Sequence, residues 1–483
     1  MPESRTAVIG SGPGGSAFAA LMAHAGHQVV LVEKNGFPGG KCSSTRHDGY
    51  VADTGVHMFG RGQWGPFGDI TRILGEGPGW SARTPSFTLS LRGGRMEMGS
   101  SQFHPVSVAS SIKGRLRGWQ KMRWPSTAVK AAREQGFGGL LSLGRRFSDK
   151  RYPLYGELQD VSVRDFFSRL SDSDDFLQTF HAMAMLTMVL PWHRASMGEF
   201  AFILASTMRS SQLCYPYGGS GAIPASFLRA LTAQGGELRL GCEAAAIETR
   251  GGRVRGITTA AGEFIAADRV VSSAGIKKTI AMAGREAFPA EYLAAADALR
   301  DSEAFIAVKY FLDRKISSMR TPCLLHMPDL SPHCMFDYLE DGSVPDDLFL
   351  FVTAPGIWDP SLVPPGKDCL IVGVPAPSDL QRVDQAASLL ARAEEIAAFL
   401  FPEISGATVA VERVLTTQVS GLSGRTAGEC IGIAQEVGQS GTNRPATSTP
   451  VQGLYLVGAD AGGRGIGTEM AADSALRLYY HLR

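Results

Sequence analysis

The sequence predicts an α/β fold with a parallel β-sheet, and two neighbouring observations support that prediction. Thr6–Ile9 is an apolar run typical of a buried strand, and a glycine turn leads from it into an apolar helix of roughly residues 14–25. Gly26 stands where a helix C-terminal glycine belongs, and Gln28–Val32 has the composition of a second strand. A strand, a helix and a strand in this order favour parallel pairing.

Further elements follow along the chain. Alternating residues around Gly-Gly turns predict hairpins over Phe87–Met98 and Glu248–Ile257, and short apolar runs predict strands over Asp268–Ser272 and Gly453–Val457. Helices are expected over Val163–Leu170, Phe176–Leu190, Ala222–Thr232, Gln385–Phe401 and Met470–His481.

The interleaving of these elements predicts a discontinuous, Rossmann-like nucleotide-binding domain with an α+β domain inserted between its pieces. We expect the nucleotide-binding domain to comprise residues 1–85, 209–285 and 448–483. The substrate domain would comprise residues 86–208 and 286–447. A chain of 483 residues is long enough for two hydrophobic cores.

Composition argues against several classes of protein. A net charge of +1 provides no overall field for nucleic acid. The seven cysteines are scattered without a C-x-x-C pair, which argues against a disulfide framework and a structural metal site. The N-terminus lacks the apolar core of a signal peptide, and no apolar run is long enough to cross a bilayer. We therefore expect a cytoplasmic protein, either soluble or attached to the inner face of the membrane.

A glycine-rich turn follows the first strand. Gly10-Ser11-Gly12-Pro13-Gly14-Gly15 matches G-x-G-x-x-G between a strand and a helix. The first glycine permits the tight turn, the second lets the backbone approach a pyrophosphate, and the third lets helix and strand pack closely. Phosphates would lie on the free N–H groups at the start of the helix. We expect Gly10, Gly12, Pro13, Gly14 and Gly15 to bind a dinucleotide.

An acidic residue ends the second strand. Glu33 lies 23 residues after Gly10, where a carboxylate bonds the ribose hydroxyls of an adenosine. The same carboxylate repels a 2′-phosphate, which disfavours NADP. We assign Lys34 to this site as well. The alternative is a glycine turn followed by an ordinary exposed glutamate.

Two later segments favour FAD over NAD. Pro38-Gly39-Gly40-Lys41 and Asp53-Thr54-Gly55-Val56-His57 follow the second strand, and an NAD dehydrogenase needs neither. A longer, extended cofactor needs more points of close backbone approach and a cation near its phosphates. Gly39, Gly40 and Lys41 would supply both, with Gly55, Val56 and His57 further along. The alternative is a plain loop.

The C-terminal block repeats the pattern of strand, glycine loop and helix. Leu454–Asp460 leads through glycines into Gly467-Thr468-Glu469-Met470 and a helix. A helix start directed at a flavin would stabilise the negative charge that develops there on reduction. Asp460 would accept hydrogen bonds from a ribityl hydroxyl or from water on the phosphate side. The alternative is a C-terminal helix with a flexible lead-in.

Together these blocks resemble the phytoene desaturase-like branch of the FAD-linked amine oxidase superfamily. Tyr215–Pro224, Gly235-Gly236-Glu237 and Val270–Gly275 resemble further motifs of that branch. The resemblance covers the whole cofactor half, whereas residues 100–208 and 286–425 match only loosely.

The resemblance implies a discontinuous FAD domain, a substrate domain and non-covalently bound FAD. It places Glu33 at the ribose and Lys41 near the phosphates. It also places the backbone of Ala244 at the adenine, Gly275 on the strand that returns to the cofactor, and Asp460 with Gly467–Met470 at the flavin. No cysteine lies near Gly462–Gly467, so a cysteinyl flavin is not expected.

The sequence also departs from the branch. Residues 463–469 replace the proline-containing glycine loop of carotenoid desaturases. Arg464 and Glu469 put charges close to the expected flavin, which argues against a purely hydrocarbon substrate. The branch includes saturases and isomerases of polyenes, so the direction of hydrogen transfer stays open.

Two residues are candidates for acid–base catalysis, namely His57 and Glu469. A structural histidine after a glycine turn, and a cap or salt-bridge residue at a helix start, are the respective alternatives. Arg425 and Arg444 would hold a carboxylate if the substrate were an amino acid, and otherwise we expect them to be solvated. Methionines and aromatic residues of segment 176–202 either line an apolar channel or pack a core.

The leading hypothesis is therefore an FAD-dependent desaturase, saturase or isomerase that acts on a polyene, isoprenoid or other lipid-like compound. An amine or amino-acid oxidase producing hydrogen peroxide is the second hypothesis, and a non-catalytic FAD-binding scaffold is the third. Residues 113–151 are rich in lysine and arginine, with interleaved tryptophans, which suits either an anionic membrane surface or a solvated helical face.

Overall fold

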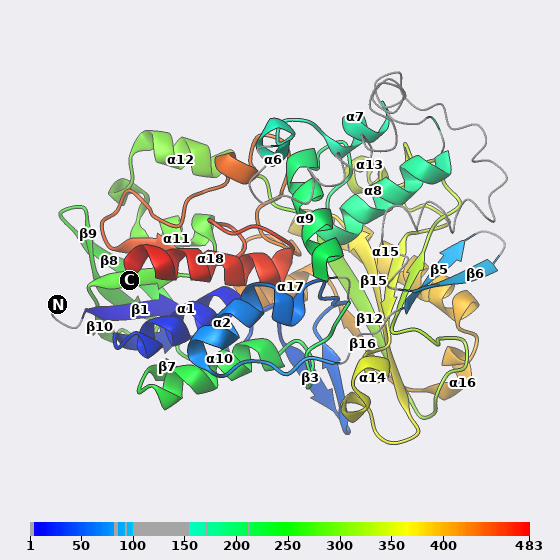
Figure 1. Cartoon of the computed structure of the whole chain (residues 1–483), viewed down its shortest axis with the longest axis horizontal. Helices are drawn as coiled ribbons and strands as arrows, with labels where there is room; N and C mark the ends of the chain where they lie inside the picture. The colour runs from blue at the N-terminus through cyan, green and yellow to red at the C-terminus, as the bar shows by residue number, and fades with distance from the viewer. Residues whose placement is uncertain are drawn as a thin grey trace.

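The computed structural model describes residues 4–81, 86–91, 94–99, 154–169, 172, 174–210 and 213–483. Two sheets lie side by side along the long axis of the molecule, and both chain termini are at the end that carries the parallel sheet (Figure 1). The basic segment 113–151 falls outside the described residues. Among the described residues, no helix is both long and apolar enough to cross a bilayer.

The parallel sheet has the strand order β17-β11-β1-β2-β7. Its strands are β1 (Arg5–Ile9), β2 (Gln28–Val32), β7 (Glu237–Arg239), β11 (Arg269–Ser272) and β17 (Leu454–Leu456). All four pairings are parallel, which confirms the predicted α/β class. Ile9 pairs with Val32, so β1 and β2 end at the same edge of the sheet.

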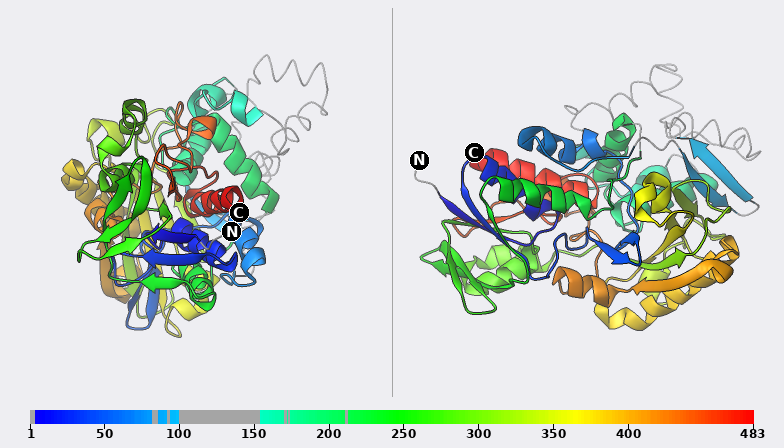
Figure 2. Two further views of the ribbon diagram at one scale, coloured as in Figure 1. Left: turned by 90° about the vertical axis from the view of Figure 1, so that its left-hand side faces the viewer. Right: turned by 90° about the horizontal axis from the view of Figure 1, so that it is seen from below.

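Three helices and a small sheet cover the parallel sheet. α1 (Pro13–His24) packs between α10 (Ala222–Ala233) and α18 (Gly467–Leu482). α1 is buried from Pro13 to Ala23, as an all-apolar helix must be. The antiparallel strands β8 (Ala244–Arg250), β9 (Arg253–Thr259) and β10 (Phe264–Ala266) lie on the side of β1 away from α18 (Figure 2).

The second sheet has seven strands in the order β16-β12-β15-β14-β13-β5-β6. Their bounds are β5 (Ser86–Leu91), β6 (Gly94–Gly99), β12 (Ala304–Leu312), β13 (Cys323–His326), β14 (Leu350–Thr353), β15 (Asp368–Ala376) and β16 (Thr408–Val414). β15 is buried throughout, because neighbouring strands flank it and α15 (Val383–Leu400) packs on it. Two separate parts of the chain therefore build this sheet, first β5 and β6 and later β12 to β16. Between them the chain returns to the parallel sheet for β7 and β11, and after them it returns again for β17.

The remaining elements are β3 (Ser44–His47), β4 (Tyr50–Asp53), α2 (Pro66–Leu74), α6 (Leu154–Glu157), α7 (Val163–Phe167), α8 (Asp174–Met188), α9 (Met197–Ser210), α11 (Ile276–Ala283), α12 (Ala290–Asp297), α13 (Tyr338–Asp341), α14 (Pro355–Trp358), α16 (Ile404–Ala407) and α17 (Thr416–Ser423), with short 3-10 turns between some of them.

Both predicted hairpins and all of the predicted helices are present, with ends shifted by a few residues. Met188, Trp192, Met197 and Phe200 pack in one buried cluster around α7, α8 and α9, which favours the core interpretation of this segment. The expected domain boundaries remain a prediction.

Candidate active site

The glycine turn between β1 and α1 is built as its sequence predicts. Gly10 has φ +91° and donates its N–H to Val32 O at 2.8 Å. A Cβ on Gly15 would lie 2.0 Å from Gly10 O, and one on Gly14 would lie 2.9 Å from the nitrogen of Gly458. Close packing of backbone against backbone therefore requires both of these glycines.

Gly12 is different, because packing does not require it. Its φ is −59°, and a Cβ there would meet no atom closer than 3.9 Å. Among the described residues, nothing accepts a hydrogen bond from the N–H groups of Gly12, Gly14 or Gly15. Three neighbouring donors without acceptors, at the positive end of a helix, fit the oxygens of a pyrophosphate.

Glu33 is buried and fully hydrogen-bonded. Its Oε2 accepts from the backbone N–H of Ser11 at 2.9 Å and from the Ser11 hydroxyl at 2.7 Å, and its Oε1 accepts from the backbone N–H and side-chain amide of Asn35, both at 2.9 Å. A ribose hydroxyl would have to replace one of the two side-chain donors. Cys242 N–H donates to Glu33 O at 2.8 Å, which places the start of β8, with Ala244, close to Glu33.

The segment after β2 approaches the glycine turn. Gly39 N–H donates to the Ser11 hydroxyl at 3.1 Å, and nothing lies within 4 Å of a Cβ on Gly40. The ammonium of Lys41 donates to the backbone carbonyl and the carboxylate of Glu429, each at 2.9 Å. The Lys34 ammonium binds the carbonyl of Gly421. Both lysines thus contact one segment, residues 421–433.

Asp53, the last residue of β4, lies next to the side chain of His57. Asp53 is buried and accepts from Ser44 at 2.7 Å, from Ser220 N–H at 2.8 Å and from the Tyr215 hydroxyl. Burial alone would raise the pKa of Asp53, but His57 and these hydrogen bonds outweigh it and lower the pKa.

The His57 imidazole is oriented by the backbone. Its Nδ1 lies 3.0 Å from Gly55 O and 3.4 Å from an Asp53 oxygen. Because a carbonyl only accepts, the proton is on Nδ1, and Nε2 has no hydrogen-bond partner among the described residues. Gly55 has open space beside its Cα, and Val56 packs against Gly373 of β15. This short segment therefore joins the nucleotide-binding half to the second sheet.

The start of α18 offers two open donors. The N–H groups of Glu469 and Met470 donate to Ile466 O at 2.9 and 3.2 Å. Those of Gly467 and Thr468 have no acceptor among the described residues. The Glu469 carboxylate accepts from Arg61 N–H at 2.9 Å and from Arg61 Nε at 2.7 Å. This geometry favours a salt-bridge role for Glu469 over an acid–base role.

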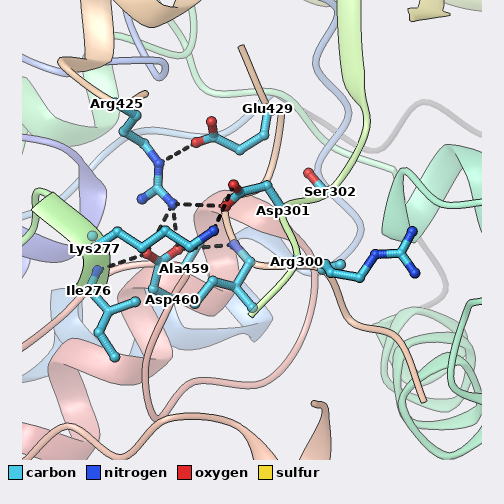
Figure 3. Close-up of polar contacts among 12 residues, drawn as sticks. Ile276, Lys277, Arg300, Asp301, Ser302, Arg425, Glu429, Ala459 and Asp460 are labelled. Carbon is cyan, nitrogen blue, oxygen red and sulfur yellow. Dashed lines mark hydrogen bonds and ion pairs between the residues drawn. The ribbon is translucent and has the colours of Figure 1, made fainter. Parts of the chain in front are cut away.

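Asp460 lies at the centre of a buried ion cluster (Figure 3). It accepts from Ile276 N–H at 3.0 Å, from Ile433 N–H at 3.1 Å and, with both oxygens, from Arg425 at 3.0 Å. Burial opposes ionisation of Asp460, but the Arg425 charge and these bonds keep its pKa below the usual value. Arg425 also contacts Glu429 and lies 3.8 Å from Asp301.

The two arginines that we expected to be solvated are in fact paired within the protein. The Arg425 side chain is 16 % exposed, and the buried Arg444 donates to the carbonyls of Ile433 and Ala459. The expectation was wrong because the partners of these arginines are distant in sequence. No local pattern in the sequence points to Asp301, Glu429 or Lys277, which complete the cluster.

Most of the predicted site residues meet at one edge of the parallel sheet. Ser11 contacts Glu33 and Gly39, Gly14 abuts Gly458, and a Cβ on Gly275 would lie 2.7 Å from Asp460. Three observations fit an extended FAD, namely the free amides at the start of α1, the free amides on α18, and open space at Gly40, Gly55 and Gly467. The described residues contain no cluster of potential metal ligands.

Comparisons with known proteins agree with this geometry. Residues 15–478 match the family described as flavin containing amine oxidoreductase. The chain is 27% identical to a zeta-carotene-forming phytoene desaturase from Myxococcus xanthus, over 94% of this chain and 89% of that one. Its fold is similar to that of an oxidoreductase from Methanosarcina mazei (TM-score 0.73, 20% identity, 99% of this chain and 100% of that one).

An engineered triple mutant of putrescine oxidase has the same fold, with a TM-score of 0.66 at 15% identity over 99% of this chain and 98% of that one. The glycine turn, the carboxylate after β2 and the C-terminal helix motif thus occur within a match that spans nearly the whole chain. The chain is an FAD-dependent oxidoreductase. It belongs to the flavin-containing amine oxidoreductase family, in the phytoene desaturase-like branch.

Proposed function

We propose that this protein transfers hydrogen between FAD and a polyene isoprenoid, in the direction of desaturation. The observation that supports this most is the match to a phytoene desaturase over both halves of the chain, including the second sheet that would face the substrate. Bound FAD supplies an acceptor for a hydride equivalent. The chain itself then has to hold the cofactor, exclude water and accept the accompanying proton.

The described residues divide these tasks. Gly12, Gly14 and Gly15 would donate to the phosphates, and Glu33 would bind the adenosine ribose. The amides of Gly467 and Thr468, at the positive end of a 16-residue helix, would stabilise negative charge near the flavin end. His57 Nε2 is the open base nearest to that end by motif, and Asp53 would stabilise the imidazolium that forms when Nε2 takes a proton.

Arg425 argues against an amino-acid substrate. A carboxylate would need a guanidinium with free donors facing the substrate side. Arg425 is bound to Asp460, Glu429 and Asp301, whereas Arg444 donates to two backbone carbonyls through Nη2 only and keeps its Nε and Nη1 without partners among the described residues. The charges of Arg464 and Glu469 are paired with Glu199 and Arg61, so they do not exclude a hydrocarbon substrate.

An anaerobic reduction experiment tests the proposal. The purified yellow protein is mixed with phytoene in detergent micelles, with a saturated isoprenoid of similar length, and with a panel of amines and amino acids. Phytoene should bleach the visible flavin absorbance, and the saturated compound should not. Bleaching by an amine, with peroxide released on admission of air, would contradict the proposal and favour an amine oxidase.

We also propose that residues 113–151 hold the protein at the inner face of an anionic membrane, where a lipid-like substrate collects. Lysines and arginines far outnumber acidic residues in this stretch, and Trp119 and Trp124 lie among them. The chain should co-sediment with anionic vesicles at low salt and less with neutral ones. Equal sedimentation with both would contradict surface attachment through this segment.

A further inference from the structure

One face of the second sheet is closed by a helix. Residues that pair across neighbouring strands have their side chains on the same face, so the pairing register defines rows that cross the sheet. One row contains four residues that are each 0 % exposed, namely Val308, Val372, Val352 and Leu324. Arg413 pairs with Val308 and binds Glu394 of α15, so this is the face that α15 covers.

The next row lies on the opposite face, because successive residues of a strand point to opposite sides. We define the open row as the five residues that pair here, namely Ala307, Gly373, Phe351, Leu325 and Leu89. None of them has a polar side chain. Leu325 and Leu89 are half-buried, and so is Phe305, two residues before Ala307 on the same face of β12. The described chain therefore covers this apolar face only in part.

Gly373 brings the open row next to His57. A Cβ on Gly373 would lie 2.6 Å from Cγ2 of Val56 and 2.7 Å from the ring of Phe305. Because glycine leaves this space, Val56, the residue before His57, packs directly on the sheet. Val56 and Met58 are half-buried and pack against the same hydrophobic cluster as Phe305. The open face therefore begins beside the proposed base.

From there the open row leads away from the nucleotide-binding half. Neighbouring strands are about 4.8 Å apart, so the three steps from Gly373 to Leu89 span about 14 Å. β5, which carries Leu89, lies on the side of the molecule remote from the parallel sheet (Figure 1).

The chemistry of the open row selects its occupant. β13, β14 and β15 each have a strand on both sides, so their backbone groups are paired within the sheet. A peptide segment or a polar ligand on this face would lose hydrogen bonds to water without replacing them. An extended hydrocarbon chain loses none and gains burial of apolar surface.

We infer that the open row binds the extended hydrocarbon chain of the isoprenoid, and that Leu325 and Leu89 select for its length. The reacting part of the chain lies beside His57, and the end of the chain reaches β5. The inference rests on the proposed function and deepens it, because it names residues that decide which isoprenoids fit.

Photoaffinity labelling tests where the chain lies. An acyclic isoprenoid hydrocarbon with a diazirine at one end is bound to the FAD-loaded full-length protein in detergent micelles and irradiated, and labelled peptides are mapped by mass spectrometry. Label should appear on β5 and β13, and excess phytoene should suppress it. Label confined to other segments, or label that phytoene does not suppress, would overturn the inference.

A substitution at Leu325 tests the selection for length. L325W should block the open row, because tryptophan fills the exposed side of a half-buried position. Labelling of β5 should fall at least about tenfold, and the rate at which phytoene bleaches the flavin should fall about 10- to 100-fold. A shorter probe that ends before Leu325 should label β12 equally in both proteins. L325A leaves the row open and should keep the labelling of β5. Undiminished labelling of β5 in L325W would contradict the inference.

Two further variants separate a block from general damage. V409W places the same side chain at a position that is 56 % exposed on the edge strand β16, and it should change neither labelling nor bleaching. L89W repeats the block at the outer end of the row and should also exclude the long probe while the short one still binds. A loss of both probes in L89W and L325W, with both variants folded, would count against selection by length.

The same experiment distinguishes this inference from the proposed function. Suppressible labelling of β5 in a protein whose flavin phytoene does not bleach would contradict the proposed function and support binding of the chain by the open row. Bleaching by phytoene without label on the open row would support the proposed function and overturn the inference.

Discussion

The two ends of the cofactor edge are built in opposite ways. At the β1–α1 turn, a single short sequence leaves three N–H donors without acceptors among the described residues. Around Asp460, five segments distant in sequence bring together charged groups that are already paired. The first end is preformed for its ligand. The second end holds its charged groups in pairs with one another.

We expect the largest effect from a matched pair of substitutions in the glycine turn, at Gly15 and Gly12. Gly15→Ala should destabilise the protein by about 3 kcal/mol or prevent folding, because its Cβ would lie 2.0 Å from a backbone oxygen that cannot move away. Gly12→Ala should leave the unfolding midpoint unchanged and weaken FAD binding about tenfold, because its Cβ would meet the chain only at ordinary contact distance but would stand where the pyrophosphate approaches. Thermal unfolding and FAD titration measure both. If the two variants behaved alike, the distinction between packing and ligand approach would fail.

A substitution in the ion cluster around Asp460 should lower the stability of the whole protein as well as its affinity for FAD. Asp460→Asn should destabilise the ligand-free protein by about 2 kcal/mol, because the new amide faces N–H donors and Arg425 loses a buried partner. Asp297→Asn removes a carboxylate that pairs with Arg285 on the surface at the end of α12 and should lower the free energy of unfolding much less. Denaturant unfolding of the two variants gives the comparison. Equal losses would indicate that the cluster contributes no more than a surface pair.

His57 is the proposed base and, unlike Asp460, keeps one polar atom without a partner among the described residues. His57→Gln should lower turnover about 100-fold, with FAD content and unfolding midpoint little changed, if Nε2 accepts the proton. His24→Gln, at the exposed end of α1, is the control. Steady-state turnover with a polyene substrate decides this, and undiminished turnover in His57→Gln would leave the histidine with a structural role only.

The smallest expected effect is a pH dependence of stability. The pKa of Asp53 in the folded protein is below its unfolded value, so its contribution is fully present above the unfolded pKa. That contribution is lost as the pH falls through the folded pKa. Asp53→Asn should therefore flatten the fall of unfolding free energy at acidic pH. An unchanged acid limb in this variant would mean that Asp53 gains nothing from His57 and Tyr215.

The same contrast explains which parts of the fold and of the site can be predicted from the sequence. The glycine turn, Glu33 and the start of α18 are local patterns, and each appears where its periodicity and glycines indicate. Arg425 looked like a solvated loop arginine because Asp460, 35 positions away, becomes its partner only after β17 joins the sheet. The seven-stranded sheet was likewise only partly predicted. β12 and β15 are buried on both faces and lack the alternation that marks a half-exposed strand.

The role of Glu469 shows the same limit. Its position at a helix start allowed either a catalytic or a structural interpretation, and the sequence could not decide between them. The deciding contact comes from Arg61, more than 400 residues earlier in the chain. Long-range ion pairs of this kind depend on the folded arrangement, so no characteristic residue spacing in the sequence reveals them.

The central claim is that one FAD extends from Glu33 and the glycine turn to Asp460 and α18. The most direct test is the amount of FAD bound per chain after the deflavinated wild type and Gly12→Ala are titrated with FAD. We predict one FAD per chain for the wild type, with clearly weaker uptake by a folded Gly12→Ala. A folded wild type that stays colourless in excess FAD would contradict the claim.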